Sequence, residues 1–299
     1  MSERPLSVDP LWPRAGSWPA LEPGESADLA LLGIPTHETS LSPTGADATP
    51  AAVREALRRY SDFVPGLEVD ALRFADAGDV RDPDGPQGEA RAVAAVAEAA
   101  TRARLLIALG GDNALTVPAA LGAFGEDLPT AGLITLDAHH DLRDGVSNGS
   151  PVRRLVEAGL DGRRIVQIGI ADFANSSAYA ARAAEYGVTV IRRDELHGRP
   201  IDDVMAEALD IAGGAGGPVH VDLDVDVCDR SVAPACPASI PGGLAAWELR
   251  RYARLAGAAP SVRSIDIAEV DATVDTPDQR TVRLAALLVL EAAAGLASR

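Results

Sequence analysis

The sequence has no lysine and only two cysteines. Its 27 strongly basic residues are therefore all arginines, and 44 aspartates and glutamates bring the formal net charge to −17. A charge of this sign repels polyanions, so we expect no nucleic-acid partner and no binding to an anionic membrane surface. The two cysteines, Cys228 and Cys236, are too few for the disulfide framework of a small secreted protein.

Targeting and membrane-spanning segments are also missing from the sequence. Residues 1–12, MSERPLSVDPLW, lack the basic start and the apolar centre of a signal peptide. No uncharged apolar run reaches the roughly 20 residues that a transmembrane helix needs. These absences predict a soluble cytoplasmic protein, and we expect its partner to be a small-molecule substrate.

Short apolar runs alternate with longer segments rich in alanine, arginine and glutamate. The runs predict strands at residues 27–35, 105–111, 132–138, 165–171, 188–191, 218–226 and 262–271. The segments between them predict helices at residues 49–60, 88–104, 114–124, 151–159, 177–187, 201–212, 245–257 and 278–297. Strands that are apolar at nearly every position and separated by helices are typical of a parallel sheet covered on both faces. We therefore predict a three-layer α/β/α fold with a central, mostly parallel sheet.

The domain organisation follows from the same pattern. Residues 1–27 are proline-rich, and we expect them to be irregular. Residues 28–299 contain no internal repeat and no linker long enough to divide them, which favours one catalytic domain. The acidic segment at residues 81–89, RDPDGPQGE, is interpreted as a loop.

Polar clusters directly follow four of the predicted strands. They are GGDN at residues 110–113, DAHHD at 137–141, DLDVD at 222–226 and EVD at 269–271. Binding sites of parallel α/β sheets form outside the carboxyl ends of the strands. We therefore expect the four clusters to meet at one edge of the sheet and to form a single site.

The DAHHD segment is the strongest candidate for binding metal. If its strand continued in extended form, Asp137, His139 and Asp141 would point to the same side. The aspartates of DLDVD have the same spacing, and carboxylates crowded in this way repel one another unless cations bind between them. Aspartates with one or two imidazoles suit Mn²⁺ and also admit nickel, iron or zinc. Two such clusters can hold two ions, which activate a shared water molecule when about 3.5–4 Å apart.

These motifs resemble those of the ureohydrolases, the family of arginase, agmatinase, guanidinobutyrase and formimidoylglutamase. The segment LLGIPTHETSLSPTGADATPAAVREAL is similar to the first strand, loop and helix of the family, and DAGDV is similar to its next segment. GGDN, DAHHD and DVDVCDRSVAPACPASIPGGL resemble its three metal-binding motifs in order and spacing. The resemblance implies an arginase-like α/β domain, two Mn²⁺ ions and assembly into trimers or hexamers.

The resemblance also implies a role for individual residues. The implied metal ligands are Asn113, Asp137, His139, Asp141, Asp224 and Asp226. Asp137 and Asp224 would bridge the two ions, and Asp141 would also pass a proton to the leaving nitrogen. Glu269 would face the amidine or guanidinium group of the substrate.

Two asparagines depart from the arginase and agmatinase pattern. Asn113 occupies the place of a histidine, and its uncharged amide oxygen is a weaker ligand, so we expect the first ion to bind less tightly. Asn148 replaces a second histidine that helps to move protons. Both departures favour formimidoylglutamase, which hydrolyses N-formimino-L-glutamate to L-glutamate and formamide in histidine breakdown.

A substrate with two carboxylates requires a cationic receptor. Three arginines lie close to the metal motif in the sequence: Arg143, Arg153 and Arg154. We predict that Arg153 binds the substrate, because a guanidinium group can bind a carboxylate through two parallel hydrogen bonds. Asn148 and Ser150 are predicted to donate further hydrogen bonds, and His140 to contact the substrate or to support the metal ligands.

The sequence leaves two alternatives to formimidoylglutamase open. The chain could be another ureohydrolase, such as a guanidinobutyrase or an agmatinase, that releases urea. It could also be a metal-poor, non-catalytic relative, because Asn113 weakens the ligand set.

Overall fold

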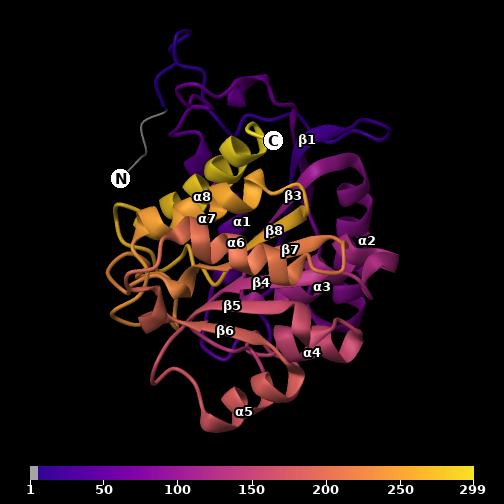
Figure 1. The fold of residues 1–299 in the computed structure, drawn as a ribbon. Helices are drawn as coiled ribbons and strands as arrows, with labels where there is room; N and C mark the ends of the chain where they lie inside the picture. The colour runs from indigo at the N-terminus through magenta and orange to yellow at the C-terminus, as the bar shows by residue number, and fades with distance from the viewer. Residues whose placement is uncertain (1–5) are drawn as a thin grey trace.

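The computed structural model describes residues 6–299 as an eight-stranded sheet with helices on both sides (Figure 1). The strands are β1 (Ala27–Ile34), β2 (Phe74–Asp79), β3 (Ala103–Gly110), β4 (Gly132–Leu136), β5 (Ile165–Ile170), β6 (Thr189–Arg192), β7 (Val219–Asp224) and β8 (Val262–Ala268). Their order in the sheet is β2-β1-β3-β8-β7-β4-β5-β6, and every neighbouring pair is parallel. The predicted central parallel sheet is thus confirmed.

Helices α1 to α7 each connect two successive strands of the sheet, and α8 follows the last strand. They are α1 (Thr49–Leu57), α2 (Gly85–Arg102), α3 (Thr116–Phe124), α4 (Pro151–Ala158), α5 (Ser177–Tyr186), α6 (Ile201–Ala212), α7 (Ala246–Ala258) and α8 (Arg280–Leu296). Residues 6–26 contain no helix or strand beyond one isolated bridge, which pairs Ala20 with Asp76. Residues 1–5 of the segment that we predicted to be irregular lie outside the described residues.

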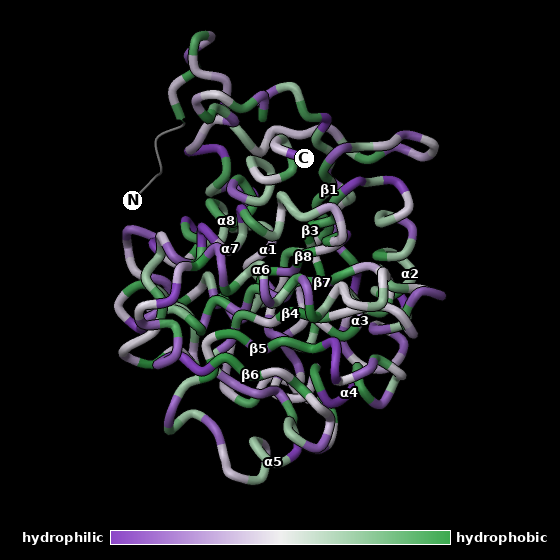
Figure 2. The backbone as a smooth tube through the Cα atoms, in the orientation of Figure 1, coloured by the Kyte–Doolittle hydropathy of each residue, from purple (hydrophilic) through white to green (hydrophobic). Residues whose placement is uncertain are grey.

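Both faces of the sheet are buried, which explains the continuous apolar runs. In β1, Leu29 and Leu31 pack into the core that also contains residues of α1, α6, α7 and α8. The alternating residues Ala30 and Leu32 pack into a second core with residues of α2 and α3. Figure 2 shows the hydrophobic colouring along the central strands and more hydrophilic colouring in the outer connections. Successive residues point to opposite faces, so a strand covered on both sides needs apolar residues at every position.

Two sequence predictions were wrong in this region. The sequence FADAGD was not predicted to be a strand, but it forms β2 at the edge of the sheet, where only its first two residues are buried. The acidic segment 81–89 is not entirely a loop, because α2 begins at Gly85 with a proline in its first turn. A proline at that position costs no backbone hydrogen bond, since the first amides of a helix have no partner within it.

Parallel pairing brings the ends of the central strands to one edge of the sheet. Leu136 of β4 pairs with Leu223 of β7, which pairs in turn with Ile267 of β8. The segments that follow β3, β4, β7 and β8 therefore leave the sheet side by side. Within residues 6–299, no helix has both the length and the apolar character needed to cross a membrane.

Candidate metal centre

The backbone turns immediately after β4 instead of continuing in extended form. The Asp137 carboxylate accepts a hydrogen bond of 2.6 Å from the backbone N–H of His139, which stabilises this turn. Asp141 has a positive φ of 54°, a conformation that side-chain-bearing residues rarely adopt. The condition under which Asp137, His139 and Asp141 would align, an extended strand, is therefore not met, because β4 ends at Leu136, but the turn keeps all three at the sheet edge.

A second turn follows β7 and separates its three aspartates. Asp222 and Asp224 belong to the strand, whereas Asp226 lies on a short 3₁₀ helix, Val225–Val227. The Asp224 carboxylate accepts a 2.8 Å hydrogen bond from the backbone N–H of Asp226. This turn places Asp224 and Asp226 at the sheet edge and leaves Asp222 within the sheet.

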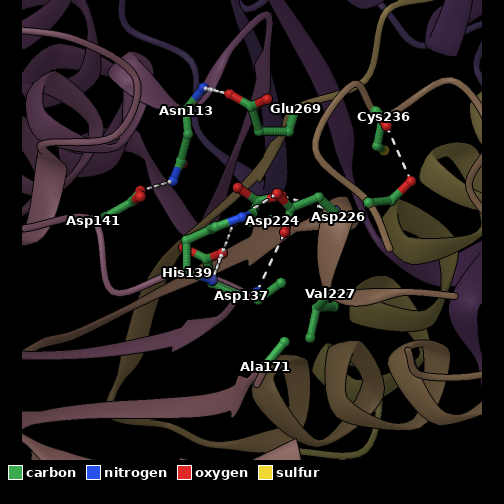
Figure 3. Close-up of polar contacts among 12 residues, drawn as sticks. Asn113, Asp137, His139, Asp141, Ala171, Asp224, Asp226, Val227, Cys236 and Glu269 are labelled. Carbon is green, nitrogen blue, oxygen red and sulfur yellow. Dashed lines mark hydrogen bonds and ion pairs between the residues drawn. The ribbon is translucent and has the colours of Figure 1, made fainter. Parts of the chain in front are cut away.

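The two turns bring their side chains into direct contact. Nδ1 of His139 lies 2.9 Å from Oδ2 of Asp226 and 3.4 Å from Oδ1 of Asp137. One ligand atom from each of these three residues lies within 4.8 Å of the others, which is the spacing of a group that can share one ion. Figure 3 shows His139, Asp137, Asp224 and Asp226 gathered at the centre of the site.

Asn113 lies on the other side of the acidic cluster, where it bonds to Asp141 of the DAHHD motif (Figure 3). Its Nδ2 donates a 2.6 Å hydrogen bond to Asp141, and its Oδ1 accepts a 2.6 Å bond from the Thr116 hydroxyl. In this structure the amide oxygen of Asn113 is thus engaged by Thr116 and is not directed at the other predicted ligands.

Glu269 lies beside Asn113 after the end of β8. It has a positive φ of 63°, and its Oε1 accepts hydrogen bonds from the Asn113 backbone N–H at 2.8 Å and from Asn148 Nδ2 at 2.6 Å. The surrounding structure must hold a residue in such a strained backbone conformation, and the two hydrogen bonds hold its side chain as well. Glu269 is fixed in this way at the wall of the site.

Burial opposes ionisation of the clustered carboxyl groups. Burial, together with the charge of Asp226, raises the pKa of Asp137 to about 6 and that of Glu269 to about 8. Burial and the neighbouring carboxylates also raise the pKa values of Asp141 and Asp224 well above their ordinary range. Without a cation, this cluster resists full ionisation at neutral pH.

His139 offsets part of the negative charge. Burial opposes the charged form of its imidazole, but Asp226 and Asp137 outweigh burial and raise its pKa to about 12. Burial likewise acts to raise the pKa of Asp226, and the charge of His139 reverses this effect and lowers it. In the absence of a metal ion, the protonated imidazole thus supplies one positive charge beside Asp137 and Asp226.

Three observations indicate that the residues of this cluster suit a divalent metal ion. Oδ2 of Asp137 is buried and accepts no hydrogen bond within residues 6–299. Four aspartates and one imidazole supply oxygen ligands with a single nitrogen, a set typical of Mn²⁺ and related ions. Burial and the neighbouring carboxylates raise the pKa values of Asp137, Asp141 and Asp224, and a bound cation would favour their ionised forms.

A cavity of about 320 Å³ opens onto this cluster. The predicted site residues that line it are Asn148, His139, Asp141, Asp224, Asp226 and Glu269. Asn113 and Asp137 are buried behind them and do not line the cavity. A small molecule in the cavity could therefore reach the acidic cluster directly.

Three residues predicted to contact the substrate do not line this cavity: His140, Ser150 and Arg153. His140 is buried, with Nδ1 2.7 Å from Oε1 of Gln167. The Ser150 hydroxyl bonds the Ser147 backbone at 2.7 Å. Arg153 holds the loop after the metal motif, since it donates to the carbonyl oxygens of Arg143 and Gly145. These side chains support the loop and do not face the cavity.

The cavity also contains residues that sequence reasoning missed. Asn175 and Tyr179 line it from the segment after β5, and Asn175 holds the metal loop by accepting a 2.9 Å bond from the His140 backbone N–H. The rule that sites form at the carboxyl ends of strands could have indicated this segment. Arg143, which the sequence placed near the site without preferring it, is the arginine that lines the cavity.

The chain belongs to the arginase family, whose model matches residues 27–295. Formimidoylglutamase from Halalkalibacterium halodurans is 35% identical over 88% of this chain and 85% of its own length. Formimidoylglutamase from Bacillus subtilis is 32% identical over 89% of this chain and 86% of its own length. The crystal structure of the Bacillus subtilis enzyme has a TM-score of 0.90 and 30% identity, and covers 99% of this chain and 96% of that chain. Trypanosoma cruzi formiminoglutamase, solved with Mn²⁺, has a TM-score of 0.85 and 26% identity, with 96% and 99% covered.

Proposed function

We propose that this protein is a binuclear-metal hydrolase of a formimino group, and that it converts N-formimino-L-glutamate into L-glutamate and formamide. The observation that carries the proposal is the convergence of Asp137, His139 and Asp226, with Asp141 and Asp224 beside them, at or just beneath the floor of one cavity. The identity of 35% and 32% to two enzymes named formimidoylglutamase supports the choice of substrate.

The proposed metal is a pair of Mn²⁺ ions held by the acidic cluster. Asp137, His139 and Asp226 would hold the ions together with Asp141 and Asp224. When bound, the two ions would supply an activated water molecule and positive charge for the reaction. Asn113 is the sixth proposed ligand, but its amide oxygen would first have to give up its bond from the Thr116 hydroxyl. We therefore propose that the ion beside Asn113 binds more weakly.

Glu269 is proposed to orient the substrate. Its carboxyl group lines the cavity and is held by Asn113 and Asn148, so a substrate amidinium group entering the cavity can donate hydrogen bonds to it. The positive charge of that group favours the ionised form of Glu269, whose pKa is about 8 in its absence.

Asp141 is proposed to move the proton that the leaving nitrogen requires. Its carboxyl group lines the cavity, where it can accept a proton and then donate it to the leaving nitrogen. The bond from Asn113 Nδ2 fixes the orientation of this carboxyl group. The chain thus provides a positioned proton carrier at the cavity wall.

Product analysis tests this function directly. Protein loaded with Mn²⁺ is incubated with N-formimino-L-glutamate, 4-guanidinobutyrate and agmatine, and formamide, glutamate and urea are measured. We expect formamide and glutamate from the first compound in equal amounts. If a guanidino compound releases urea and formiminoglutamate releases no formamide, the proposed substrate is wrong and the guanidino compound takes its place. No product from any of the three would favour a non-catalytic relative.

The proposal includes a cytoplasmic homo-oligomer, as the family resemblance implies. Light scattering on the purified chain checks the assembly, since a trimer or hexamer has three or six times the chain mass of 30.9 kDa. A monomer mass at the concentrations used for the activity assay would contradict it.

A further inference from the structure

Arg143 is the arginine that lines the cavity above the acidic cluster. The other charged residues lining this cavity are His139, Asp141, Asp224, Asp226 and Glu269. All five belong to the proposed metal or amidine-binding machinery. A cation at the cavity wall that takes no part in this machinery is available to another part of the substrate.

The exposed side chain of Arg143 contacts Tyr179 and Gly149, and its backbone is held by two hydrogen bonds. Its Cζ lies 6.0 Å from the centre of the Tyr179 ring, within the range of a cation–π contact. Its stem passes over Gly149, where a Cβ atom would lie 2.7 Å from Cδ of Arg143, so the glycine leaves room for it. Its backbone N–H donates to Gly149 at 2.9 Å, and its carbonyl oxygen accepts a 2.6 Å bond from Arg153.

Arg143 differs from nearby arginines because its charge is not paired. Arg153 forms an ion pair with Glu157, Arg154 with Glu89, and Arg182 with Asp144. Within residues 6–299, no carboxylate lies at ion-pair distance from the Arg143 guanidinium. In a chain of net charge −17, a positioned guanidinium without a carboxylate partner is well placed to accept one from a ligand.

We propose that Arg143 is the specificity-determining residue that binds a carboxylate of the substrate. This inference rests on the proposed amidine hydrolysis and assigns its substrate class, an amidine linked to a carboxylate. Asp141 and Arg143 are two residues apart, so their Cα atoms are at most about 7 Å from each other. The reacting group and the carboxylate can therefore belong to one small molecule that lies between the acidic cluster and Arg143.

Comparison of two substrates tests this role in the Mn²⁺-loaded protein. The first is N-formimino-L-glutamate, and the second is N-butylformamidine, which has the amidine but no carboxylate. In Arg143→Ala we expect kcat/KM for the acidic substrate to fall about 10- to 100-fold, mainly through KM, because a charge-assisted hydrogen bond is lost. For N-butylformamidine, kcat/KM of Arg143→Ala should stay within about twofold of the value for the parent protein. Arg143→Lys should retain part of the preference, since it keeps the charge and loses the planar fork.

Arg182→Ala is the matched control. Arg182 lies 5.8 Å from the centre of the same Tyr179 ring, but it pairs with Asp144 and does not line the cavity. This variant should keep the ratio between the two substrates. An equal fall for both substrates in Arg143→Ala, or an equal change of their ratio in Arg182→Ala, would overturn the assignment.

Calorimetric binding of L-glutamate to the Mn²⁺-loaded protein separates this inference from the proposed function. We expect Arg143→Ala to weaken glutamate binding about 10-fold or more, whether or not the parent protein turns over either amidine. If no amidine is hydrolysed but glutamate binding depends on Arg143, the reaction is wrong and the carboxylate receptor stands. If the parent protein binds no glutamate, or Arg143→Ala binds it equally well, the receptor is refuted.

Discussion

Two groups of aspartates lie a few residues apart on the same sheet and have different surroundings. The cavity aspartates are Asp137, Asp141, Asp224 and Asp226, which surround His139 at or just beneath the cavity floor. The sheet aspartates are Asp222 and Asp266, which pair in register on β7 and β8 and line no part of that cavity. Strand β7 contributes to both groups, so the same alternating sequence has two outcomes.

The two groups differ in their hydrogen-bond partners and in their access to the cavity. Nε2 of the buried His220 lies 2.9 Å from Asp266, and its Nδ1 lies 2.6 Å from the Ser264 hydroxyl. Burial and the nearby Asp266 raise the pKa of Asp222 well above its ordinary range. Asp266 thus has a hydrogen-bond partner in His220, and burial favours the neutral form of Asp222, although Oδ1 of each accepts no hydrogen bond within residues 6–299. The cavity aspartates lie at or just beneath the floor of a cavity that an ion could enter. We therefore expect metal to bind the cavity aspartates and not the sheet aspartates.

The largest expected effect is the loss of a cavity aspartate. Asp224→Ala removes a proposed ligand of both ions, and we expect kcat to fall by more than about 1000-fold and bound manganese to decrease. Steady-state kinetics and metal analysis of the purified variant measure both changes. Turnover close to that of the parent protein would remove Asp224 from the proposed metal centre.

Loss of a sheet aspartate should affect stability instead. Asp266→Ala leaves the buried His220 without its carboxylate partner, and we expect the free energy of unfolding to fall by about 3 kcal/mol. Denaturant unfolding of the metal-free protein measures this value, and metal analysis checks that manganese content is retained. A loss of bound manganese with unchanged stability would reverse the roles assigned to the two groups.

Much of this fold follows from local sequence patterns. The apolar runs and the helical segments between them predict the sheet and all eight helices described, because strands buried on both faces require continuous apolar residues. The strand β2 was missed because an edge strand with one polar half lacks this signal. The convergence of four motifs was predictable because parallel strands end at the same edge.

The detailed geometry of the site could not be predicted in the same way. The positive φ angles of Asp141 and Glu269 depend on tertiary contacts that a local pattern does not contain. Sequence proximity to the metal motif was equal evidence for Arg143 and Arg153. Only the structure shows that Arg153 bonds the loop carbonyl oxygens while Arg143 faces the cavity.

Metal and pH should act together on the cavity aspartates. The pKa values of Asp137 and Glu269, about 6 and about 8, are raised, so the stability of the metal-free protein should fall as pH rises from about 4 to 8. Mn²⁺ binds the ionised groups, so it should stabilise the protein increasingly over this range. At a free Mn²⁺ concentration 100 times Kd, we expect the free energy of unfolding at pH 8 to rise by about 2.7 kcal/mol, which corresponds to a rise of roughly 5 °C in Tm.

Thermal unfolding at several pH values, with Mn²⁺ or with a chelator, measures this divergence. The double variant Asp137→Asn, Glu269→Gln is the control, and its metal-free stability should depend less on pH. A metal-free protein that becomes more stable from pH 5 to pH 8 would contradict the sign of the two pKa shifts.

The smallest expected effect concerns Asn113. Asn113→His replaces an amide, whose oxygen is bonded by Thr116, with an imidazole ligand, and we expect the affinity for the weaker ion to rise about 10-fold or more. Manganese content at equal free metal concentration measures the change. Thr116→Val is a useful comparison, because it frees the Asn113 oxygen without adding a ligand. Identical manganese content in the parent protein and Asn113→His would contradict the assignment of Asn113.

The most direct test of metal binding by the cavity aspartates is an anomalous difference map from crystals grown with Mn²⁺. We predict two manganese peaks at the cavity floor, within bonding distance of Asp137 and Asp224, and no peak beside Asp222 or Asp266. An empty cavity floor at saturating Mn²⁺, or a peak at the sheet aspartates alone, would contradict this account.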